Sequence, residues 1–493
     1  MNILFAASEV AQISQLGGLG DVVSALPNQL HTLGITTRIV IPFTTSIDFK
    51  RYQLKKKLEY SVSMAGLEEH VTVWKTDYLR VVPVYILENR RYFYSPIMYR
   101  DFNGFLEAAR YAFFSKAVLE LIPQWDFQPD VIHTHDFYTG LIALFRNTIY
   151  KDHPVIGKIA TILTIHSIRA QGQVSDSILD FAEIAKKDLT TYRKNQGGDI
   201  NLVEQEILNA DMLTTVSPTY ARELSISQNA YGLENTIKSK KKDFYGILNG
   251  IDVHEYDPRK ENDLYHSYGT SNVFDIKPKN KEKLLRHFKL QHRMDQPVIS
   301  MITRLDDQKG IDLLLEAFPK FMEMDVTFFL LGQGRLDYVK SFKEMAKRYS
   351  DRMKAIFTFE HPLSKLIYAG SDILLMPSKF EPCGLTDMIA MRYGTLPLVH
   401  LVGGLKDAVR DEYNGFGFVE FNQEALLSTI ARAVNLYSDY QNLRKLRRVR
   451  ESKWAGMILH AMHKDVSWKK SARQYRTIYR KAIEKRQSLK NNV

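Results

Sequence analysis

Short apolar runs alternate along the chain with loops and with stretches of helical spacing. The runs predict strands at residues 2–7, 37–41, 131–133, 159–165 and 212–216 in the first half, and at 298–302, 327–331, 355–358, 373–376 and 396–399 in the second. Residues 21–33 and 104–121 predict helices, the first of which Pro27 should bend or interrupt. This alternation predicts an α/β fold with doubly wound parallel sheets, covered by helices on both faces.

Three segments depart from the alternation. Residues 52–98 are rich in Val, Tyr and Thr with short alternations, which predicts antiparallel strands inserted into the first domain. The polar stretch 257–280 is the clearest change in composition, and the linker should lie just before it, near Asn249. Residues 466–483 predict an amphipathic helix, whose apolar face consists of Trp468, Ala472, Tyr475, Ile478 and Tyr479.

The length of the chain sets its domain count. With 493 residues it is too long for one ordinary core, so two or three domains are expected. We expect a first domain over residues 1–248, a second over 249–463, and a closing helix with a basic tail over 464–493.

Composition excludes several classes of protein. The apolar share of 45% and charged share of 25% are those of a soluble globular protein, and no apolar run is long enough to span a membrane. The first residues enter a strand directly, without the charged start of a signal peptide. The single cysteine, Cys383, excludes an internal disulfide framework and a cysteine-ligated zinc site. We expect a cytoplasmic protein that needs neither a metal nor an organic cofactor.

The chain has a net charge of +11, and the excess basic residues are concentrated toward its end, between Lys445 and Arg486. A nucleic-acid surface would have this sign. No nucleic-acid-binding motif accompanies the charge, however, so we favour a structural helix with a solvated basic face and expect no nucleic-acid partner.

The turn between Pro377 and Thr386 carries the most informative candidate chemistry. Glu381 lies there at the carboxyl end of a predicted strand, and residues 384–386 lie at the start of a predicted helix over 387–393. Backbone N–H groups and the positive end of the helix dipole favour a phosphate. A carboxylate beside a phosphate fits a sugar attached to a diphosphate. Taken alone, the motif fits an acidic turn that caps a helix equally well.

Arg304 and Lys309 favour the first interpretation. They follow another predicted strand, and in an open α/β sheet the loops at the carboxyl ends of the strands face one crevice. Two cations five residues apart can clamp a diphosphate, arginine as a fork and lysine as a point charge. Alone, this spacing usually marks a solvated surface. Beside Glu381 it predicts a diphosphate site.

Two further clusters lie in the first half. Gly17 and Gly18 follow a strand and would let the backbone approach a pyrophosphate. A nicotinamide enzyme is the alternative for such a loop, but the Gly-x-Gly-x-x-Gly spacing and its distant acidic residue are missing. His133, His135 and His166 are, taken alone, more often core or strand-end histidines than ligands, and no partner motif completes a zinc site.

These motifs form an ordered series that resembles the bacterial glycogen synthases and plant starch synthases over nearly the whole chain. The series comprises Ser8-Glu9, Gly17-Gly18-Leu19-Gly20-Asp21, His133-Thr134-His135-Asp136, Thr164-Ile165-His166, Val216-Ser217-Pro218, Leu248-Asn249-Gly250, Arg304 with Lys309, Glu381-Pro382-Cys383-Gly384-Leu385-Thr386 and Gly403-Gly404-Leu405.

The resemblance implies a retaining glucosyltransferase with two Rossmann-like domains facing across a cleft, the GT-B type, and a closing helix that crosses back onto the first domain. Its donor would be a nucleotide sugar, ADP-glucose in preference to UDP-glucose. Its acceptor would be the non-reducing end of glycogen or a maltooligosaccharide, an α-1,4-glucan.

The resemblance also implies roles for single residues. Arg304 and Lys309 would stabilise the departing diphosphate, Glu381 would bind glucose hydroxyls, and His166 would lie near the reacting carbon; these four form the catalytic set. The implied substrate-binding residues are Gln15, Gly17, Gly18, Asp21, Asp136, Asn249, Cys383, Gly384, Leu385 and Thr386.

Several pocket positions depart from the family pattern. The usual Lys-Thr before Gly-Gly, the Trp after His-x-His-Asp, the Asn after Ile-His, and the Arg and Thr before the second Gly-Gly are replaced by Gln15, Leu16, Phe137, Ser167, His400 and Val402. Each lost charge-assisted contact would cost roughly 1.5–3 kcal/mol. A working enzyme is favoured because the catalytic set is present. An altered-specificity transferase and a weakly active or non-catalytic glucan-binding paralogue remain the alternatives.

Overall fold

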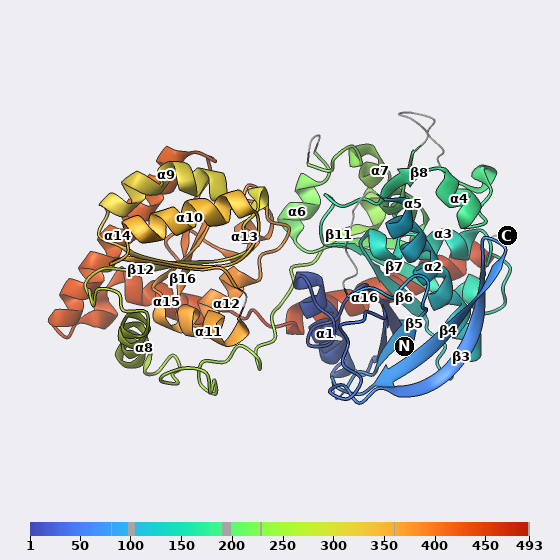
Figure 1. The fold of residues 1–493 in the computed structure, drawn as a ribbon, viewed down its shortest axis with the longest axis horizontal. Helices are drawn as coiled ribbons and strands as arrows, with labels where there is room; N and C mark the ends of the chain where they lie inside the picture. The colour runs from blue at the N-terminus through green and yellow to red at the C-terminus, as the bar shows by residue number, and fades with distance from the viewer. Residues whose placement is uncertain (80, 97–103, 190–198, 227–228, 359, 492–493) are drawn as a thin grey trace. The chain divides into compact units, whose positions relative to one another are not determined.

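The computed structural model describes the chain except residues 80, 97–103, 190–198, 227–228, 359 and 492–493. It divides into two compact units: unit 1 is Met1–Asn249 with Trp468–Val493, and unit 2 is Gly250–Ser467. Each unit has a largely parallel sheet with helices on both faces, which confirms the predicted fold class (Figure 1). In the described part of the chain, no helix is both long and apolar enough to cross a membrane.

Unit 1 is built on a nine-stranded sheet in the order β11-β10-β7-β6-β1-β2-β5-β4-β3. Its central pairs are parallel and mostly buried, as the apolar runs predicted. The strands are β1 (Asn2–Ala6), β2 (Thr36–Pro42), β3 (Lys55–Met64), β4 (Leu67–Thr76), β5 (Val84–Glu88), β6 (Val131–His135), β7 (Ala160–Ile165), β10 (Met212–Thr215) and β11 (Phe244–Gly246). A separate small sheet pairs β8 (Gln173–Ser175) with β9 (Asp199–Asn201).

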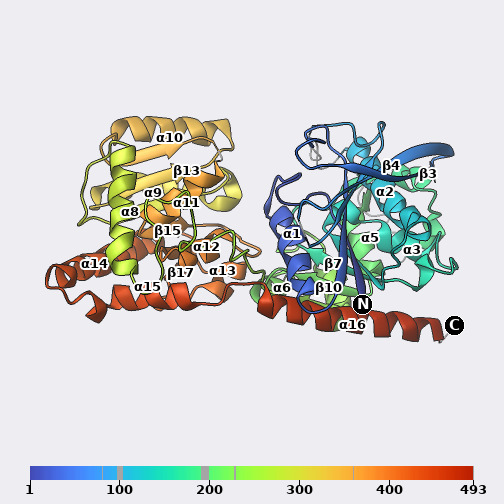
Figure 2. The ribbon, with the colours of Figure 1, turned by 90° about the horizontal axis from the view of Figure 1, so that it is seen from below.

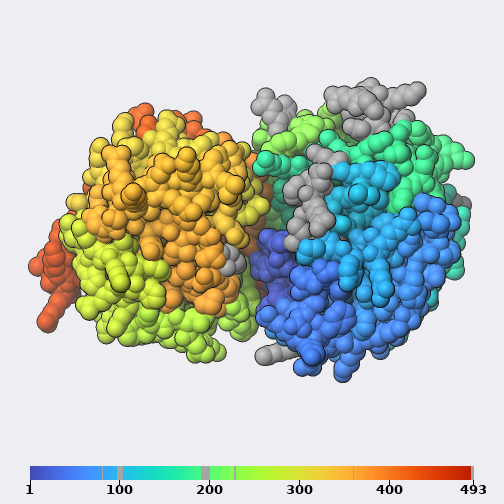
Figure 3. Space-filling view, viewed as in Figure 1, coloured from blue at the N-terminus to red at the C-terminus, as the bar shows by residue number. Residues whose placement is uncertain are grey.

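The predicted antiparallel insert is present as a hairpin of β3 and β4, which extends the sheet at its edge. Side chains of β3 alternate between exposed and buried, so one face of the hairpin lies on the surface of unit 1 (blue in Figure 3). β5, within the same predicted segment, pairs antiparallel with β4 and parallel with β2. The last two residues of the segment, 97 and 98, lie outside the described part.

The helices of unit 1 include both predicted ones. The first continues past Pro27 and ends at His31, so Pro27 does not interrupt it. The helices are α1 (Gly18–His31), α2 (Phe105–Leu121), α3 (Ile142–Asn147), α4 (Ser177–Phe181), α5 (Leu202–Asn209), α6 (Pro218–Glu223), α7 (Glu234–Ser239) and α16 (Lys469–Asn491).

Unit 2 contains a six-stranded sheet, entirely parallel, in the order β14-β13-β12-β15-β16-β17. Its strands are β12 (Val298–Ile302), β13 (Thr327–Leu331), β14 (Met353–Ile356), β15 (Ile373–Met376), β16 (Leu396–His400) and β17 (Phe416–Phe418). Its helices are α8 (Val273–His287), α9 (Ile311–Glu323), α10 (Leu336–Arg348), α11 (His361–Gly370), α12 (Thr386–Arg392), α13 (Gly403–Ala408), α14 (Gln423–Lys445) and α15 (Lys453–His463).

The closing helix α16 belongs to unit 1 and lies along it beside α1 (Figure 2). The five apolar residues predicted for its packing face, Trp468 to Tyr479, are all buried. Its far end is fixed by polar contacts: Arg486 donates to Gly157 O at 2.7 Å, and Lys485 donates to Asp211 O at 2.9 Å. Part of the basic tail therefore holds the helix in place, which the charge pattern alone did not indicate.

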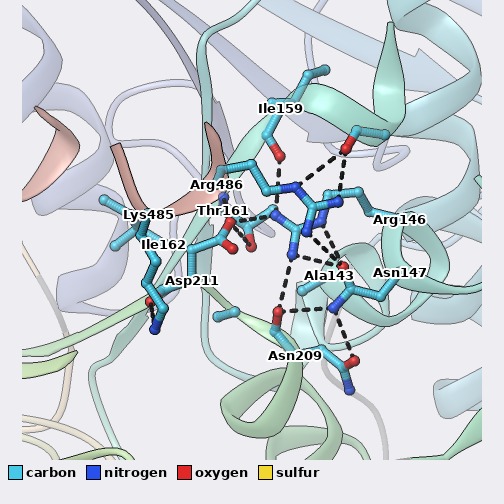
Figure 4. A network of polar contacts seen from close by, with 12 residues as sticks. Ala143, Arg146, Asn147, Ile159, Thr161, Ile162, Asn209, Asp211, Lys485 and Arg486 are labelled. Carbon is cyan, nitrogen blue, oxygen red and sulfur yellow. Dashed lines mark hydrogen bonds and ion pairs between the residues drawn. The ribbon is translucent and has the colours of Figure 1, made fainter. Parts of the chain in front are cut away.

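These contacts surround a buried ion pair between Arg146 and Asp211 (Figure 4). The Arg146 side chain is fully buried, and its guanidinium also donates to the carbonyl oxygens of Ile159 and Asn209 at 3.0 and 3.1 Å. The same Asp211 oxygen accepts a hydrogen bond from Thr161 N at 2.7 Å. The pair thus joins α3, β7 and the turn before β10.

Removal of one partner of this pair should destabilise unit 1 strongly. In Asp211→Ala, the buried Arg146 guanidinium loses its counter-charge, which should cost about 3–5 kcal/mol. The double variant Arg146→Met/Asp211→Leu should recover most of that loss. Native-state hydrogen exchange of the β7 amides measures the free energy of unfolding of unit 1 separately. A loss below about 1 kcal/mol in Asp211→Ala would contradict the expectation.

Candidate active site

The loops that carry Arg304, Lys309 and Glu381 start from neighbouring strands of unit 2. β12 and β15 are parallel and adjacent, with Ile299 opposite Ile373. Their carboxyl ends therefore meet at one edge of the sheet, which is where open α/β sheets bind ligands. The first loop contains a short 3-10 turn, Asp307–Lys309, and the second runs from the end of β15 to the start of α12.

Lys309 and Glu381 form an ion pair in unit 2. Lys309 Nζ lies 2.6 Å from Glu381 Oε2, and Ser378 Oγ donates to the same oxygen at 3.0 Å. The side chains are only 16% and 9% exposed. Two donors on one carboxylate oxygen fix its position, and low exposure strengthens the charge interaction. Ser378 is a member of this site that the sequence motifs did not single out.

Arg304 is not part of that pair. Its side chain is 68% exposed, and its guanidinium pairs with Asp306 of the same loop, at 3.5 Å. An exposed pair at this distance contributes little. The structure therefore places Arg304 on the same loop as Lys309 but leaves its guanidinium in solvent.

The two loops touch backbone to backbone at Gly310, and Gly403 at the start of α13 packs equally closely on Glu381. A Cβ on Gly310 would lie 1.9 Å from Pro377 O, and a Cβ on Gly403 would lie 1.9 Å from Glu381 O. Both glycines have positive φ angles, +67° and +46°. Lys379 N also donates to Gln308 O at 2.8 Å. The main chain around Glu381 is therefore fixed from two sides.

Residues 383–386 connect this carboxylate to α12. Gly384 has a φ angle of +85°, and Cys383 is buried. Thr386 begins α12, but its hydroxyl donates back to Met376 Sδ at 3.2 Å. Behind the turn, burial raises the pKa of Asp387 to about 8, with a smaller contribution from the charge of Glu381. Asp387 is therefore mostly protonated at neutral pH.

His400 braces the same loop. Its ring nitrogens lie 2.7 Å from Ser378 O and 2.9 Å from Val419 O. Both of these atoms are main-chain carbonyl oxygens, so the ring lies between two backbone segments. Phe418 stacks on the ring, with centroids 5.2 Å apart. His400 therefore connects the loop that carries Glu381 with the segment that follows β17.

The glycine loop of unit 1 surrounds an internal carboxylate. Glu9 accepts hydrogen bonds from the backbone N–H groups of Leu16, Gly17 and Gly20, at 2.6, 3.1 and 2.9 Å. Burial nevertheless raises the pKa of Glu9 to about 7, and nearby Asp21 adds to the rise. In the loop whose backbone was expected to approach a pyrophosphate, the N–H of Gly17 thus already donates to Glu9. Glu9 was part of a sequence motif but had been given no role.

Gln15 and Gly18 lie on the exposed side of the same loop. The Gln15 amide donates to Gly17 O at 3.0 Å, so the side chain folds over the loop. Packing is tight behind it, because a Cβ on Gly20 would lie 2.9 Å from Gln15 Cγ. The residue that replaces the usual lysine therefore has a local structural contact.

The second cluster of unit 1 lies where β6 and β7 end. Asp136 has a φ angle of 53°, and its Oδ1 accepts from the backbone N–H groups of His166 and Ser167 at 2.7 and 3.3 Å. Burial raises its pKa to about 7, against the effect of those two donors. Asp136 thereby fixes the main chain of His166. The strained backbone of Asp136 is typical of functional sites.

Histidines continue this cluster into the core. His135 Nδ1 lies 3.0 Å from His166 Nε2, and the ring centroids of His133 and His135 are 4.3 Å apart. Burial lowers the pKa of His166 to about 3. Among the residues that the structure describes, no three His, Cys, Asp or Glu side chains are arranged to hold a metal ion. Asn249, also predicted for the site, is buried at the end of the main part of unit 1.

Comparison with known proteins identifies the family. The family described as "Starch synthase catalytic domain" matches residues 2–239, and "Glycosyl transferases group 1" matches residues 282–450. A glycogen synthase of Desulforudis audaxviator is 37% identical over 98% of this chain and 97% of its own length. A glycogen synthase of Bacillus cereus is 35% identical over 98% of this chain and all of its own length. The chain belongs to the glycogen and starch synthase family.

Solved structures agree with membership of this synthase family. The catalytic domain of starch synthase IV from Arabidopsis thaliana, determined with ADP and acarbose bound, has a TM-score of 0.89 at 29% identity, covering 98% of this chain and 99% of that one. Sucrose-phosphate synthase from Thermosynechococcus elongatus shares the fold, with a TM-score of 0.59 at 16% identity and coverage of 97% and 98%. The chain is therefore a glycosyltransferase of the GT-B class.

The variant Gly403→Ala tests the close contact between Gly403 and the Glu381 main chain. A control variant measures the effect of backbone strain alone. The new Cβ would push the Glu381 main chain away, so we expect turnover to fall about a hundredfold, the scale of a roughly 1 Å displacement of a catalytic group. Gly34→Ala is the matched control, because Gly34 has a φ angle of +73° but no atom within 4 Å of its added Cβ. It should lower stability by about 1–2 kcal/mol and leave turnover unchanged. Equal turnover in both variants would contradict this.

Proposed function

We propose that this glycosyltransferase moves glucose from ADP-glucose to the non-reducing end of an α-1,4-glucan, with retention of configuration. Glycogen or a maltooligosaccharide would be the acceptor. The names of the relatives and the ADP in the starch synthase IV structure support this donor and this acceptor class. The proposal involves no metal, organic cofactor, nucleic acid or membrane.

The Lys309–Glu381 pair at the carboxyl ends of β12 and β15 is the observation that carries the proposal. A purely structural ion pair would gain nothing from a position at this edge of the sheet. Here a fixed carboxylate lies beside an ammonium group and an exposed guanidinium on the same side of unit 2. A carboxylate suits neutral hydroxyl groups, and the cations suit a diphosphate. A nucleoside diphosphate sugar supplies both.

Unit 2 would hold the donor. Arg304 and Lys309 would bind the diphosphate oxygens, and the backbone N–H groups of residues 383–386 would add donors. Glu381 would bind glucose hydroxyls. In the ligand-free protein the charge of Lys309 is balanced by Glu381, so the exposed Arg304 would be the first cation to attract the diphosphate.

Unit 1 would orient the sugar and the acceptor. His166 would lie near the reacting carbon, and Asp136 would support it through the main chain and bind a hydroxyl. The remaining predicted binding residues of this unit, Gln15, Gly17, Gly18, Asp21 and Asn249, would complete the donor contacts. Gly17 would contribute only if its N–H group no longer donated to Glu9, or if the donor contacted the carbonyl side of the loop instead.

The transfer itself needs no protein nucleophile on this scheme. The bond between the sugar's anomeric carbon and the diphosphate oxygen breaks, and the electron pair leaves with the diphosphate. The acceptor oxygen forms the new bond on the same face, and its proton passes to the departing phosphate oxygen. Arg304 and Lys309 would stabilise the charge that grows on the leaving group, which is the usual large electrostatic contribution.

Parallel transfer assays test the proposal. Radiolabelled glucose should enter glycogen from ADP-glucose faster than from UDP-glucose. Incorporation from UDP-glucose alone would contradict the donor. No incorporation from either, with the protein still retained on a glycogen affinity gel, would identify a glucan-binding protein without activity.

Opposite effects on binding and turnover should distinguish the two partners of the ion pair. Glu381→Gln should lower kcat at least about a hundredfold, yet bind ADP about tenfold more tightly because Lys309 loses its carboxylate partner. Lys309→Ala and Arg304→Ala should lower kcat on the same scale and weaken ADP binding. Calorimetry with ADP and initial-rate kinetics measure the two effects.

Lys379→Ala is the control for these variants, because Lys379 lies in the same loop but pairs with Asp312 at 2.6 Å. It should retain wild-type kcat. Near-normal turnover in Lys309→Ala would contradict the assignment of the catalytic set.

A further inference from the structure

His135 and His166 share a single hydrogen bond between two neutral rings. His135 Nδ1 and His166 Nε2 are 3.0 Å apart. Burial lowers the pKa of His166 to about 3 and holds that of His135 well below its ordinary value, with nearby His133 and His166 adding to the latter effect. Each ring therefore carries one proton at neutral pH. One ring must donate to the other, and the direction decides both tautomers.

The opposite nitrogen of His135 indicates the direction. His135 Nε2 is buried, and none of the residues that the structure describes forms a hydrogen bond with it. If His166 donated, the proton of His135 would be on this Nε2, as a buried N–H group without an acceptor. Such orphan donors are rare in folded proteins and cost about 1–3 kcal/mol. If His135 donates, its proton lies on Nδ1 and is used.

We propose that His135 is a positioning residue that donates through Nδ1–H to His166 Nε2 and so fixes His166 in the tautomer that carries its proton on Nδ1. His166 then presents an N–H donor to a hydroxyl oxygen of the transferred sugar. This last step rests on the proposed function, whereas the tautomer is a property of the ligand-free protein.

The surroundings of His135 are built to hold the ring still. Phe5 on the neighbouring strand β1 stacks on it at 5.8 Å and 18°, and His133 packs against it on the same face of β6. His133 is itself held by Tyr479 of α16 at 2.9 Å and by Thr164 of β7 at 2.6 Å. A column of rings thus runs from the closing helix to His166.

Consecutive residues fix the two parts of His166. His135 holds the ring, and Asp136 holds the backbone N–H at 2.7 Å. The His-x-His-Asp motif therefore positions His166, which lies about thirty residues further along the chain. The first histidine of the motif supports the second. This explains why both histidines of the motif are buried and neither is aimed at solvent.

Nitrogen-15 NMR of histidine-labelled protein tests the tautomer without any substrate. The signals of His166, one of 14 histidines, are identified by their loss in His166→Gln. Long-range proton–nitrogen correlations should show a protonated Nδ1 and an unprotonated Nε2 in the wild type. A protonated Nε2 on His166, or two tautomers in exchange, would overturn the proposal whatever the activity of the protein.

Kinetics test the positioning role with a rescue. His135→Leu removes the donor and should lower kcat about tenfold or more with little change in KM, because the bound sugar meets a misoriented ring. His135→Asn keeps an amide N–H attached to Cγ, as Nδ1 is, and should restore most of the loss. Equal losses in the two variants, with folding intact by circular dichroism, would overturn the role of the donor.

His133→Asn is the matched control. His133 lies two residues earlier in the same strand and is equally buried, but its nitrogens contact Tyr479 and Thr164. This variant should lower stability and leave the His166 NMR pattern unchanged. If it changed the His166 tautomer as His135→Leu does, general loosening of the core would replace the proposal.

Discussion

Contact between two loops at the carboxyl ends of β12 and β15 is the constraint on which the Lys309–Glu381 ion pair of unit 2 depends. Neighbouring parallel strands bring both loops to one edge, but the ion pair needs more than proximity. Gly310 of the first loop and Gly403 at the start of α13 let carbonyl oxygens of the second loop approach to distances that any side chain would prevent. Ser378, itself braced by His400, then fixes the carboxylate that pairs with Lys309. The closely packed backbone therefore holds these charged groups in place.

The ionisable groups of the two units have different surroundings. Unit 2 keeps a carboxylate and an ammonium group ionised side by side, with a guanidinium in solvent. Unit 1 buries its acids under main-chain N–H groups, and burial raises the pKa of Glu9 and of Asp136 to about 7. Burial also holds the pKa of His133, His135 and His166 below the ordinary value of histidine.

The departures from the family pattern have local explanations in part. Gln15 folds back onto Gly17, and His400 spans two carbonyl oxygens in place of the usual arginine. Ser167 contributes its backbone N–H to Asp136, a contact that does not depend on its side chain. Nothing in the structure explains Val402. These replacements leave the Lys309–Glu381 pair of unit 2 and the contacts of His135 and Asp136 with His166 in unit 1 in place.

The sequence by itself determined the fold class and the two sets of loops. Buried parallel strands appear in the sequence as continuous apolar runs, and the candidate functional residues of the loops occur in short motifs, such as Glu381 with its neighbours. It did not reveal α8, which begins inside a polar stretch, because the buried face of that helix includes the polar residues Lys277, Asn280 and Lys281 beside its apolar ones. Nor did it reveal Ser378, the cage around Glu9 or the donor role of His135. These depend on hydrogen-bond directions and backbone distances between segments far apart in the chain, and only tertiary packing decides them.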